Sequence, residues 1–572
     1  MEYSAIFHDM DKRFCYAIDK DLFVIRVQVK KDDMKEVILH YEDKYIPMER
    51  KDTRMTLPMK KVATSQFHDY YEAQLRMNLI CLRYFFEFTD MQGEKVYYGN
   101  YEFDKECITN RDRMFDCPQN LREEEMFEVP QWAANKVVYQ IFPSRFATTQ
   151  PVDKKLWYKA PITPMDDLHG NLRGIIEHLD YIKNLGIDVV YLTPIFKSNS
   201  CHKYDTIDYY QVDPSFGTTE DLKELVQKSH ERGMKVVLDA VYNHTGREFF
   251  AFQDILEKGE KSKYLDWYFI DELPPRGEWG EIPNFKCFGY YGGMPKLNLK
   301  NPEVEKYITD VACYWIKECD IDGWRLDVGD EISHFFWKNF RKAIKAVKKD
   351  MLIIGEIWHY AGDFLEGDEW DTVMNYPFYL NLIDLLADEK INVSQFVQNL
   401  GYLKGRLNKK CYPLMWNLID SHDTARFLHL CNDNKKKQHL AAAFQLLLPG
   451  MPMVYYGDEY AMPGANDPDC RRGMYWDEEY QDKEMYNWYK KLMQVRKTHA
   501  CIVEGEMIEI IANDDEDTIV MIRKNGEETI AMLFNCGNSA KEFNEYAEKY
   551  NLLTDSAFDG KVEGLDAAVI VL

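Results

Sequence analysis

IDGWRLDVGDEISHFFWKNFRKAIKAVKKDMLIIGEIW (321–358) contains the structural unit from which most of this chain is built. Two short apolar runs end in polar residues, and a helical stretch of mixed apolar and basic residues separates them. Continuous apolar strands joined by helices are typical of a parallel sheet whose outer face is covered. The stretch therefore predicts two neighbouring parallel strands with a crossover helix between them.

Apolar runs of the same kind recur eight times along the chain, with helical stretches between them: KVVYQIF (136–142), IDVVYLTPIF (187–196), MKVVLDAVYN (234–243), IDGWRLDV (321–328), MLIIGEIW (351–358), DTVMNY (371–376), LMWNLIDSHD (414–423) and MPMVYYGDE (451–459). Eight such units predict an α/β fold, an eight-stranded parallel β/α (TIM) barrel over 126–500. The longest gap, 245–300, follows strand three and predicts a small inserted subdomain.

The two flanks alternate apolar and polar residues with a period of two. Such runs occur in 1–125, for example DLFVIRVQVK (21–30) and LRYFFEFTD (82–90), and again in 501–572, for example TIVMIRK (518–524). Short alternating runs separated by turns are typical of β-sandwiches. We therefore expect an N-terminal and a C-terminal β-sandwich on either side of the barrel.

Composition excludes several classes of partner. A net charge of −25 argues against nucleic acid and anionic membrane surfaces, and it suits a neutral substrate. The first residues, MEYSAIFHDMDKRF, have no apolar core, which argues against a signal peptide. Thirteen cysteines without a CxxC pair are typical of reduced thiols. We expect a cytoplasmic protein.

Polar residues end four of the predicted strands: DAVYNH (239–244), GWRLDV (323–328), GEIWH (355–359) and IDSHD (419–423). In a β/α barrel the carboxyl ends of the strands converge on one site. The ends of these strands would bring together three carboxylates and three cations or cation-formers. The carboxylates are Asp327, Glu356 and Asp423, and the cations or cation-formers are Arg325, His244 and His422. The sequence therefore predicts a site rich in carboxylates.

Retaining glycoside hydrolysis needs one ionised and one protonated carboxyl group close together. Arg325 and Asp327 are two residues apart and point to the same side of their strand, so the guanidinium should hold Asp327 ionised. Glu356 faces other carboxylates, which should raise its pKa and keep a proton for the leaving oxygen. Asp423 and the two histidines are placed to bind sugar hydroxyls.

These four segments resemble, in order and spacing, the signature segments of the α-amylase superfamily of glycoside hydrolases. The resemblance implies that Asp327 is the nucleophile, Glu356 the acid/base catalyst and Asp423 the stabiliser of the transition state. It also implies that a further group of residues binds or orients the sugar in the cleaved subsite: Arg325, His244, His422, Asp239 and Tyr204, the last in HKYDT (202–206).

A narrower resemblance is carried by MPKLN (294–298), which is similar to a marker of the neopullulanase, cyclomaltodextrinase and maltogenic amylase subfamily. DPDCR (467–471) resembles the same subfamily, and this implies that Asp467 and Arg471 hold the next sugar on the non-reducing side. Trp358 would stack on the leaving-group side. We expect an enzyme for cyclodextrins, maltooligosaccharides and pullulan, with some transglycosylation.

Two other functions fit parts of this pattern. An oligo-1,6-glucosidase or α-glucosidase of the same superfamily would share the carboxylates, but MPKLN and the extra N-terminal domain speak against it. A non-catalytic carbohydrate-binding protein on this barrel should lack at least one of Asp327, Glu356 and Asp423, and this chain has all three.

Cofactor and assembly follow from the same resemblance. Many relatives hold calcium at two stretches that here read RFATTQP (145–151) and LHGNLRG (168–174). Thr148 and Asn171 replace stronger ligands, so we expect no metal or other cofactor there. In the subfamily the N-terminal module covers the partner's active site in a homodimer. Tyr45 in YEDKYIP (41–47) is placed to offer an aromatic ring to such a cleft.

Overall fold

The computed structural model describes residues 1–47, 54–76, 79–118, 126–277 and 280–572. The chain forms two compact units. The first comprises Met1–Val129 with Ala361–Asp368 and Ser394–Tyr412, and the second comprises the rest. The predicted domain boundary at residue 125 lies outside the described residues. The three domain ranges derived from the sequence, 1–125, 126–500 and 501–572, stay a prediction. No helix among the described ranges is long and apolar enough to cross a membrane.

The N-terminal unit is a β-sandwich. One antiparallel sheet has the order β1-β2-β6-β5 and the other β4-β3-β7-β8-β9, with β10 beside β7. Ile25, Leu75 and Phe86 belong to the apolar core that the two sheets share. The strands are β1 (Cys15–Ala17), β2 (Leu22–Lys30), β3 (Met34–Asp43), β4 (Met55–Pro58), β5 (Lys60–Thr64), β6 (His68–Arg76), β7 (Cys81–Asp90), β8 (Lys95–Tyr98), β9 (Phe103–Asp104) and β10 (Phe115–Pro118).

Two segments that connect barrel strands, Ala361–Asp368 and Ser394–Tyr412, belong to this N-terminal unit. The guanidinium of Arg26 on β2 donates to the backbone carbonyls of Gly405 and Leu407 at 2.9 and 2.8 Å. It also pairs with Glu72 at 2.9 Å, so the buried charge is compensated. The C-terminal half of α10 (Val393–Arg406) is thereby bound to the sandwich.

All eight predicted barrel strands are present in the second unit. They are β11 (Val138–Ile141), β12 (Val189–Leu192), β15 (Lys235–Ala240), β16 (Gly323–Leu326), β17 (Leu352–Gly355), β18 (Thr372–Val373), β19 (Trp416–Leu418) and β20 (Met451–Tyr455). The order β18-β17-β16-β15-β12-β11-β20-β19 is parallel throughout, and a bridge between Met374 and Trp416 joins its two ends. The sheet is thus a barrel, as predicted.

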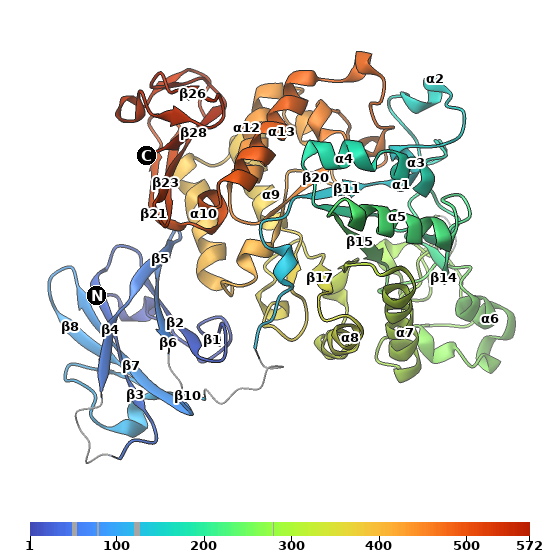
Figure 1. Ribbon diagram of the computed structural model, residues 1–572. Helices are drawn as coiled ribbons and strands as arrows, with labels where there is room; N and C mark the ends of the chain where they lie inside the picture. The colour runs from blue at the N-terminus through green and yellow to red at the C-terminus, as the bar shows by residue number, and fades with distance from the viewer. Residues whose placement is uncertain (48–53, 77–78, 119–125, 278–279) are drawn as a thin grey trace. The chain divides into compact units, whose positions relative to one another are not determined.

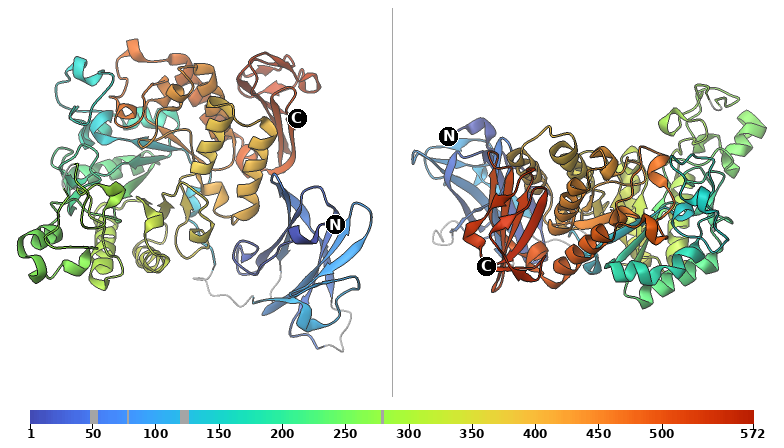
Figure 2. Two further views of the ribbon diagram at one scale, coloured as in Figure 1. Left: turned by 180° about the vertical axis from the view of Figure 1, so that it is seen from behind. Right: turned by 90° about the horizontal axis from the view of Figure 1, so that it is seen from above.

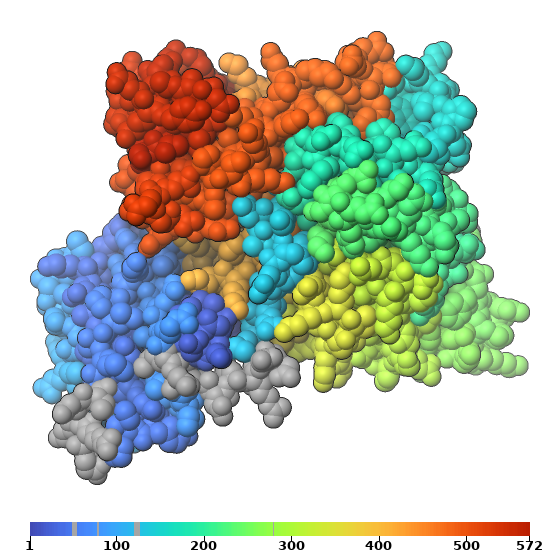
Figure 3. Space-filling model, viewed as in Figure 1, coloured from blue at the N-terminus to red at the C-terminus, as the bar shows by residue number. Residues whose placement is uncertain are grey.

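Helices surround the barrel and carry caps that the sequence encodes. They include α4 (Leu179–Leu185), α5 (Thr219–Glu231), α7 (Pro302–Cys319), α8 (His334–Val347), α12 (Lys435–Leu447) and α13 (Lys483–Thr498). Thr218 and Asp221 form a capping box at α5, and Asn301 precedes Pro302 at the start of α7. In Figure 1 these helices form an outer layer around the barrel strands. In the space-filling view of Figure 3, atoms of the helices lie over the strands.

One of the eight predicted strand–helix units differs from the expectation. The connection from β17 to β18 contains a short 3-10 helix, Gly362–Phe364, in place of an α-helix. Half of that connection, Ala361–Asp368, belongs to the N-terminal unit.

The C-terminal residues, for which a β-sandwich is predicted, form a six-stranded antiparallel sheet and a separate two-stranded one. The larger sheet has the order β21-β22-β23-β28-β25-β26, and the smaller one is the pair β24-β27. The strands are β21 (Glu506–Asn513), β22 (Thr518–Asn525), β23 (Glu528–Asn535), β24 (Lys541–Glu542), β25 (Tyr550–Asn551), β26 (Ser556–Ala557), β27 (Lys561–Val562) and β28 (Asp566–Val571). Phe534 stacks on Phe444 of α12 at 4.3 Å between ring centroids, and Figure 2 shows this sheet beside that helix.

Candidate active site

Arg325 lies at the centre of the carboxylate cluster and is completely buried on β16. One terminal nitrogen lies 2.8 Å from Asp327 and 3.2 Å from both oxygens of Asp239. The other lies 3.0 Å from Glu356 and 3.8 Å from Asp423. One guanidinium thus joins residues from the ends of β15, β16 and β17 to the turn after β19.

The charges in this cluster do not balance, because four carboxyl groups face one guanidinium. Burial raises the pKa of Asp327 well above its usual range; Arg325 opposes this shift, and Glu356, Asp239 and Asp423 add to it. Burial likewise raises the pKa of Asp239 to about 6, with Arg325 opposing. Arg325 thus favours the ionised form of Asp327, as expected, while burial and the neighbouring carboxylates oppose it. That Arg325 keeps Asp327 ionised stays a prediction.

Glu356 accepts two hydrogen bonds in addition to its ion pair with Arg325. The backbone N–H of Val328 donates to its Oε2 at 2.9 Å, and the indole N–H of Trp358 donates to its Oε1 at 3.2 Å. Val328 has a φ of 48°, a left-handed conformation that β-branched residues avoid. This strain aims the N–H at Glu356 and is the kind of feature that occurs at functional sites.

His422 is buried behind Asp423 and acts as a neutral group. Its Nε2 lies 3.1 Å from Asp423 and also contacts the hydroxyl of Tyr204, while the side-chain amide of Gln140 donates to Nδ1 at 2.8 Å. Burial, together with the charges of Arg471 and Arg325, lowers the pKa of His422 well below its usual range. A donor at Nδ1 leaves the ring proton on Nε2, facing Tyr204 and Asp423.

Tyr204 and His244 lie beside the cluster. The hydroxyl of Tyr204 donates to Asp239 at 3.1 Å, and its ring is parallel to that of His422. His244 bonds through Nε2 to the backbone carbonyl of Tyr204 at 3.1 Å, and burial lowers its pKa to about 3. Its Nδ1 is buried without a hydrogen-bond partner. The two histidines are thus neutral, where the sequence suggested cation-formers.

Asp423 forms the open side of the cluster. Its side chain is 27% exposed, against 8% for each of Asp327 and Glu356. Arg471 reaches Asp423 at 3.4 Å, pairs with Asp467 at 2.7 Å and donates to the backbone carbonyl of His422 at 2.8 Å. Arg471 therefore connects Asp467 to the third carboxylate.

Trp358 is exposed over 43% of its surface and stacks on Tyr376 at 3.9 Å between ring centroids. All eleven residues predicted for the site are therefore placed around the carboxyl ends of β15, β16, β17 and β19. Their catalytic and binding roles stay predictions.

Sequence reasoning missed three buried residues of the site. Gln140 holds His422, Tyr191 donates to Asp239 at 2.6 Å, and Tyr376 supports Trp358. Gln140 and Tyr191 lie within strands, in KVVYQIF and IDVVYLTPIF. A polar side chain inside an otherwise apolar run was the signal that would have identified both, because buried polar groups need partners.

The stretches compared with calcium sites form internal contacts instead. The side-chain oxygen of Asn171 accepts from the backbone N–H of Gly174 at 2.8 Å and caps α3 (Leu172–Glu177). Its amide nitrogen contacts Thr148 at 3.3 Å. Within the described ranges, no group of three or more His, Cys, Asp or Glu is arranged to hold a metal ion. The side-chain oxygen of Asn171 is thus engaged within the chain, and the absence of calcium from this place stays a prediction.

The sequence and fold of this chain are similar to those of known proteins. Residues 140–505 match the model of the α-amylase catalytic domain, and residues 1–119 match that of the α-amylase N-terminal Ig-like domain. The chain is 41% identical to a cyclomaltodextrinase of Geobacillus thermopakistaniensis, covering 99% of this chain and 97% of that protein. It is 38% identical to an intracellular maltogenic amylase of Bacillus subtilis, covering 94% and 92%. A solved cyclomaltodextrinase structure superposes with a TM-score of 0.94 at 36% identity, over 100% of both chains.

Proposed function

Since this chain belongs to the α-amylase family of glycoside hydrolases, in the subfamily of neopullulanases, cyclomaltodextrinases and maltogenic amylases, we propose that it cleaves α-1,4-glucosidic bonds with retention of configuration. It is an α-glucan hydrolase, and the proposed substrates are cyclodextrins, maltooligosaccharides and pullulan. We propose in addition that it transfers glucosyl groups to sugar acceptors. The observation that carries the proposal is the contact of Asp327 and Glu356 with neighbouring nitrogens of the single Arg325 guanidinium.

The proposed reaction has two steps. A carboxylate oxygen of Asp327 attacks the anomeric carbon, the glucosidic bond breaks, and Glu356 gives its proton to the leaving oxygen. Glu356 then takes a proton from water or from a sugar hydroxyl, whose oxygen displaces Asp327 from the anomeric carbon. Retaining enzymes hold the two carboxyl groups about 5–5.5 Å apart, and binding to one planar guanidinium supports such a spacing.

The electrostatics of the cluster support this cycle. Four carboxyl groups around one buried guanidinium favour retention of a proton near neutral pH, as the raised pKa values of Asp327 and Asp239 indicate. We propose that this proton is shared by the cluster and resides on Glu356 when substrate is bound. The indole of Trp358 beside Glu356 would then contact the leaving sugar.

Asp423 and its neighbours would bind the sugar that is cleaved. Asp423 has the most exposed side chain of the three carboxylates and accepts from Arg471, so it is preorganised to bind sugar hydroxyls as the ring distorts. His422 would donate from Nε2, and Asp467 with Arg471 would hold the next sugar. These roles follow from position and charge.

Product analysis tests the substrate assignment. The same enzyme preparation is given β-cyclodextrin, pullulan, maltotriose, isomaltose and soluble starch, and initial rates are compared. We expect cleavage of α-1,4 bonds, with β-cyclodextrin turned over much faster than soluble starch. Fastest turnover of isomaltose would instead assign the chain as an oligo-1,6-glucosidase.

The proposal extends to location and assembly. A cysteine pattern without a CxxC pair and a relative named as an intracellular maltogenic amylase support a cytoplasmic enzyme. Tyr45 lies in the turn after β3 and is 66% exposed, which supports its availability to a partner subunit. We propose a homodimer in which the N-terminal module of one subunit narrows the cleft of the other, with no metal or other cofactor.

A further inference from the structure

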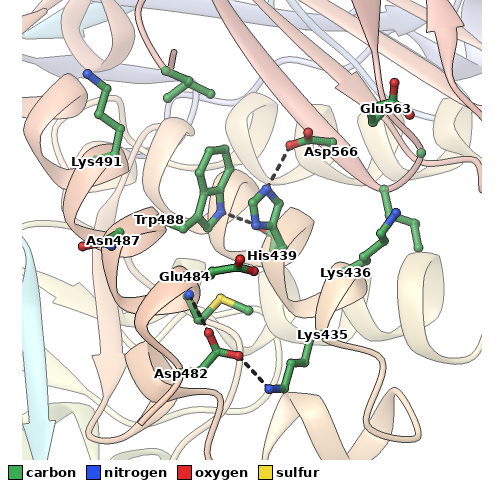
Figure 4. Close-up of a pocket in the computed structure, with 14 residues that line it drawn as sticks. Lys435, Lys436, His439, Asp482, Glu484, Asn487, Trp488, Lys491, Glu563 and Asp566 are labelled. Atoms are coloured by element: carbon green, nitrogen blue, oxygen red, sulfur yellow. Dashed lines mark hydrogen bonds and ion pairs between the residues drawn. The ribbon is translucent and has the colours of Figure 1, made fainter. Parts of the chain in front are cut away.

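A second pocket lies at the junction of α12, α13 and the turns of the C-terminal sheet (Figure 4). Its volume is about 600 Å³, within the range of small-molecule binding sites. None of the residues that line it belongs to the carboxylate cluster. The pocket is therefore a separate feature of the second unit.

A rigid aromatic pair forms the centre of this pocket. Trp488 of α13 stacks on His439 of α12 at 3.8 Å between ring centroids and 10° between ring planes. The indole N–H donates to the backbone carbonyl of His439 at 2.9 Å, and the imidazole Nε2 lies 2.9 Å from Asp566 of β28. Figure 4 shows the two rings side by side among the lining residues. An aromatic surface fixed in this way binds at little cost in side-chain entropy.

The polar lining is close to electrical neutrality. Three lysines, at 435, 436 and 491, face four carboxylates, at 482, 484, 563 and 566. Lys435 is already paired with Asp482 at 2.6 Å. This balance disfavours a phosphate or another strong anion, which needs a surplus of cations. Exposed side chains of Glu484 and Asn487 adjoin the aromatic pair and present an acceptor and an amide.

We propose that this pocket is a second binding site for a neutral glucan chain, distinct from the catalytic site. The apolar C–H face of a glucose ring would pack on the rigid aromatic pair, while its hydroxyls would bond to the amide of Asn487 and the carboxylate of Glu484. The choice of a glucan rests on the proposed function.

Calorimetric titration with maltohexaose tests the proposal, using the full-length Asp327→Asn variant so that the ligand is not hydrolysed. We expect two sites per chain. Adding Trp488→Ala should weaken one of them at least tenfold and leave the other unchanged. Trp132→Ala is the matched control, because Trp132 is also half-buried and donates its indole N–H to a backbone carbonyl, that of Asp350 at 2.8 Å.

A second variant covers the case in which Trp488→Ala does not fold. The double change Glu484→Ala with Asn487→Ala alters exposed side chains, and it should also weaken the second site. A single site per chain, or two sites that survive every substitution, would overturn the proposal. Failure of the wild-type enzyme to hydrolyse any α-1,4-glucan would instead overturn the proposed function, and the two failures are therefore distinguishable.

Discussion

Arg325 organises the active site at the scale of single residues. Among the described ion pairs, it is the one guanidinium that contacts all four of the carboxylates Asp239, Asp327, Glu356 and Asp423. The two neutral histidines nearby are oriented by hydrogen bonds: Gln140 fixes the ring proton of His422, and the carbonyl of Tyr204 binds His244. The site therefore depends on residues that do not touch the substrate as well as on the carboxylates.

Gln140→Leu should lower kcat/KM by about tenfold, roughly the contribution of one hydrogen bond. Without the donor at Nδ1, His422 would lose its fixed tautomer and present its proton to Tyr204 and Asp423 only part of the time. Steady-state kinetics on β-cyclodextrin measure the effect. Gln445→Leu is the control, because Gln445 is equally buried but bonds to backbone carbonyls of Asn417 and Met453. An equal loss of activity in both variants would contradict the role of Gln140.

The predictability of the site from sequence depended on where each residue lies in its strand. Asp327 and Glu356 directly follow apolar runs, so the barrel pattern alone brought them to one end. Gln140 lies inside an apolar run, where its only signal is that a buried polar side chain needs a partner. The raised pKa of Asp327 was not predictable either, because it depends on desolvation by the whole barrel rather than on its neighbour Arg325.

At the scale of elements, Lys296 ties the insertion after β15 to the barrel. Its ammonium contacts the side-chain oxygen of Asn243 and lies 3.2 Å from the carboxylate of Glu331 and 3.3 Å from its backbone carbonyl. Lys296 belongs to MPKLN, and residue 244 pairs with it as a β-bridge. Three oxygens around one cation thus connect the end of β15, the insertion and the turn after β16.

Lys296→Met should lower the melting temperature by several degrees, because it leaves Asn243 and Glu331 without their shared cation. Differential scanning calorimetry measures the change. Lys286→Met is a control within the same insertion, since Lys286 forms an exposed pair with Asp271 and should contribute little. Equal melting shifts for the two variants would show that Lys296 has no special role.

Calcium removal should not affect this protein. Asn171 uses its side-chain oxygen to cap α3 and its nitrogen to contact Thr148, so its oxygen is engaged within the chain. We expect EDTA to leave activity and melting temperature almost unchanged. Asn171→Ala should cost about 1 kcal/mol, as the loss of a helix cap does, with and without calcium. A melting shift of several degrees on EDTA treatment, reversed by added calcium, would require another set of ligands.

At the scale of the whole molecule, the eight barrel strands and both flanking sheets were predictable, because each has a local pattern of apolar residues. The assignment of 361–368 and 394–412 to the N-terminal unit was not. Arg26 shows why: it is one basic residue in an apolar run, and its partners at 405 and 407 are 379 and 381 residues away. Contacts over such separations leave no local signal.

The proposed dimer links the N-terminal module to substrate size. Deleting residues 1–125 would remove the contacts that residues 394–412 make with the N-terminal unit, so a loss of folding could not be told from a loss of dimerisation. The substitution Tyr45→Ala is therefore the better test. We expect a full-length dimer in sedimentation at micromolar concentration, and a several-fold lower kcat/KM on β-cyclodextrin in the variant with little change on starch. Tyr101→Ala, at an 80% exposed tyrosine of the same unit, is the control. A monomer that still strongly prefers cyclodextrin would refute the link.

The central claim is that Asp327 is the nucleophile of a retaining reaction, and trapping the covalent intermediate tests it most directly. The enzyme is incubated with a fluorinated glucosyl fluoride, digested and analysed by mass spectrometry. The account predicts one glucosyl adduct, located on Asp327, and none in Asp327→Asn, whose turnover should fall by several orders of magnitude. An adduct on another residue, or near-normal turnover by Asp327→Asn, would contradict the account.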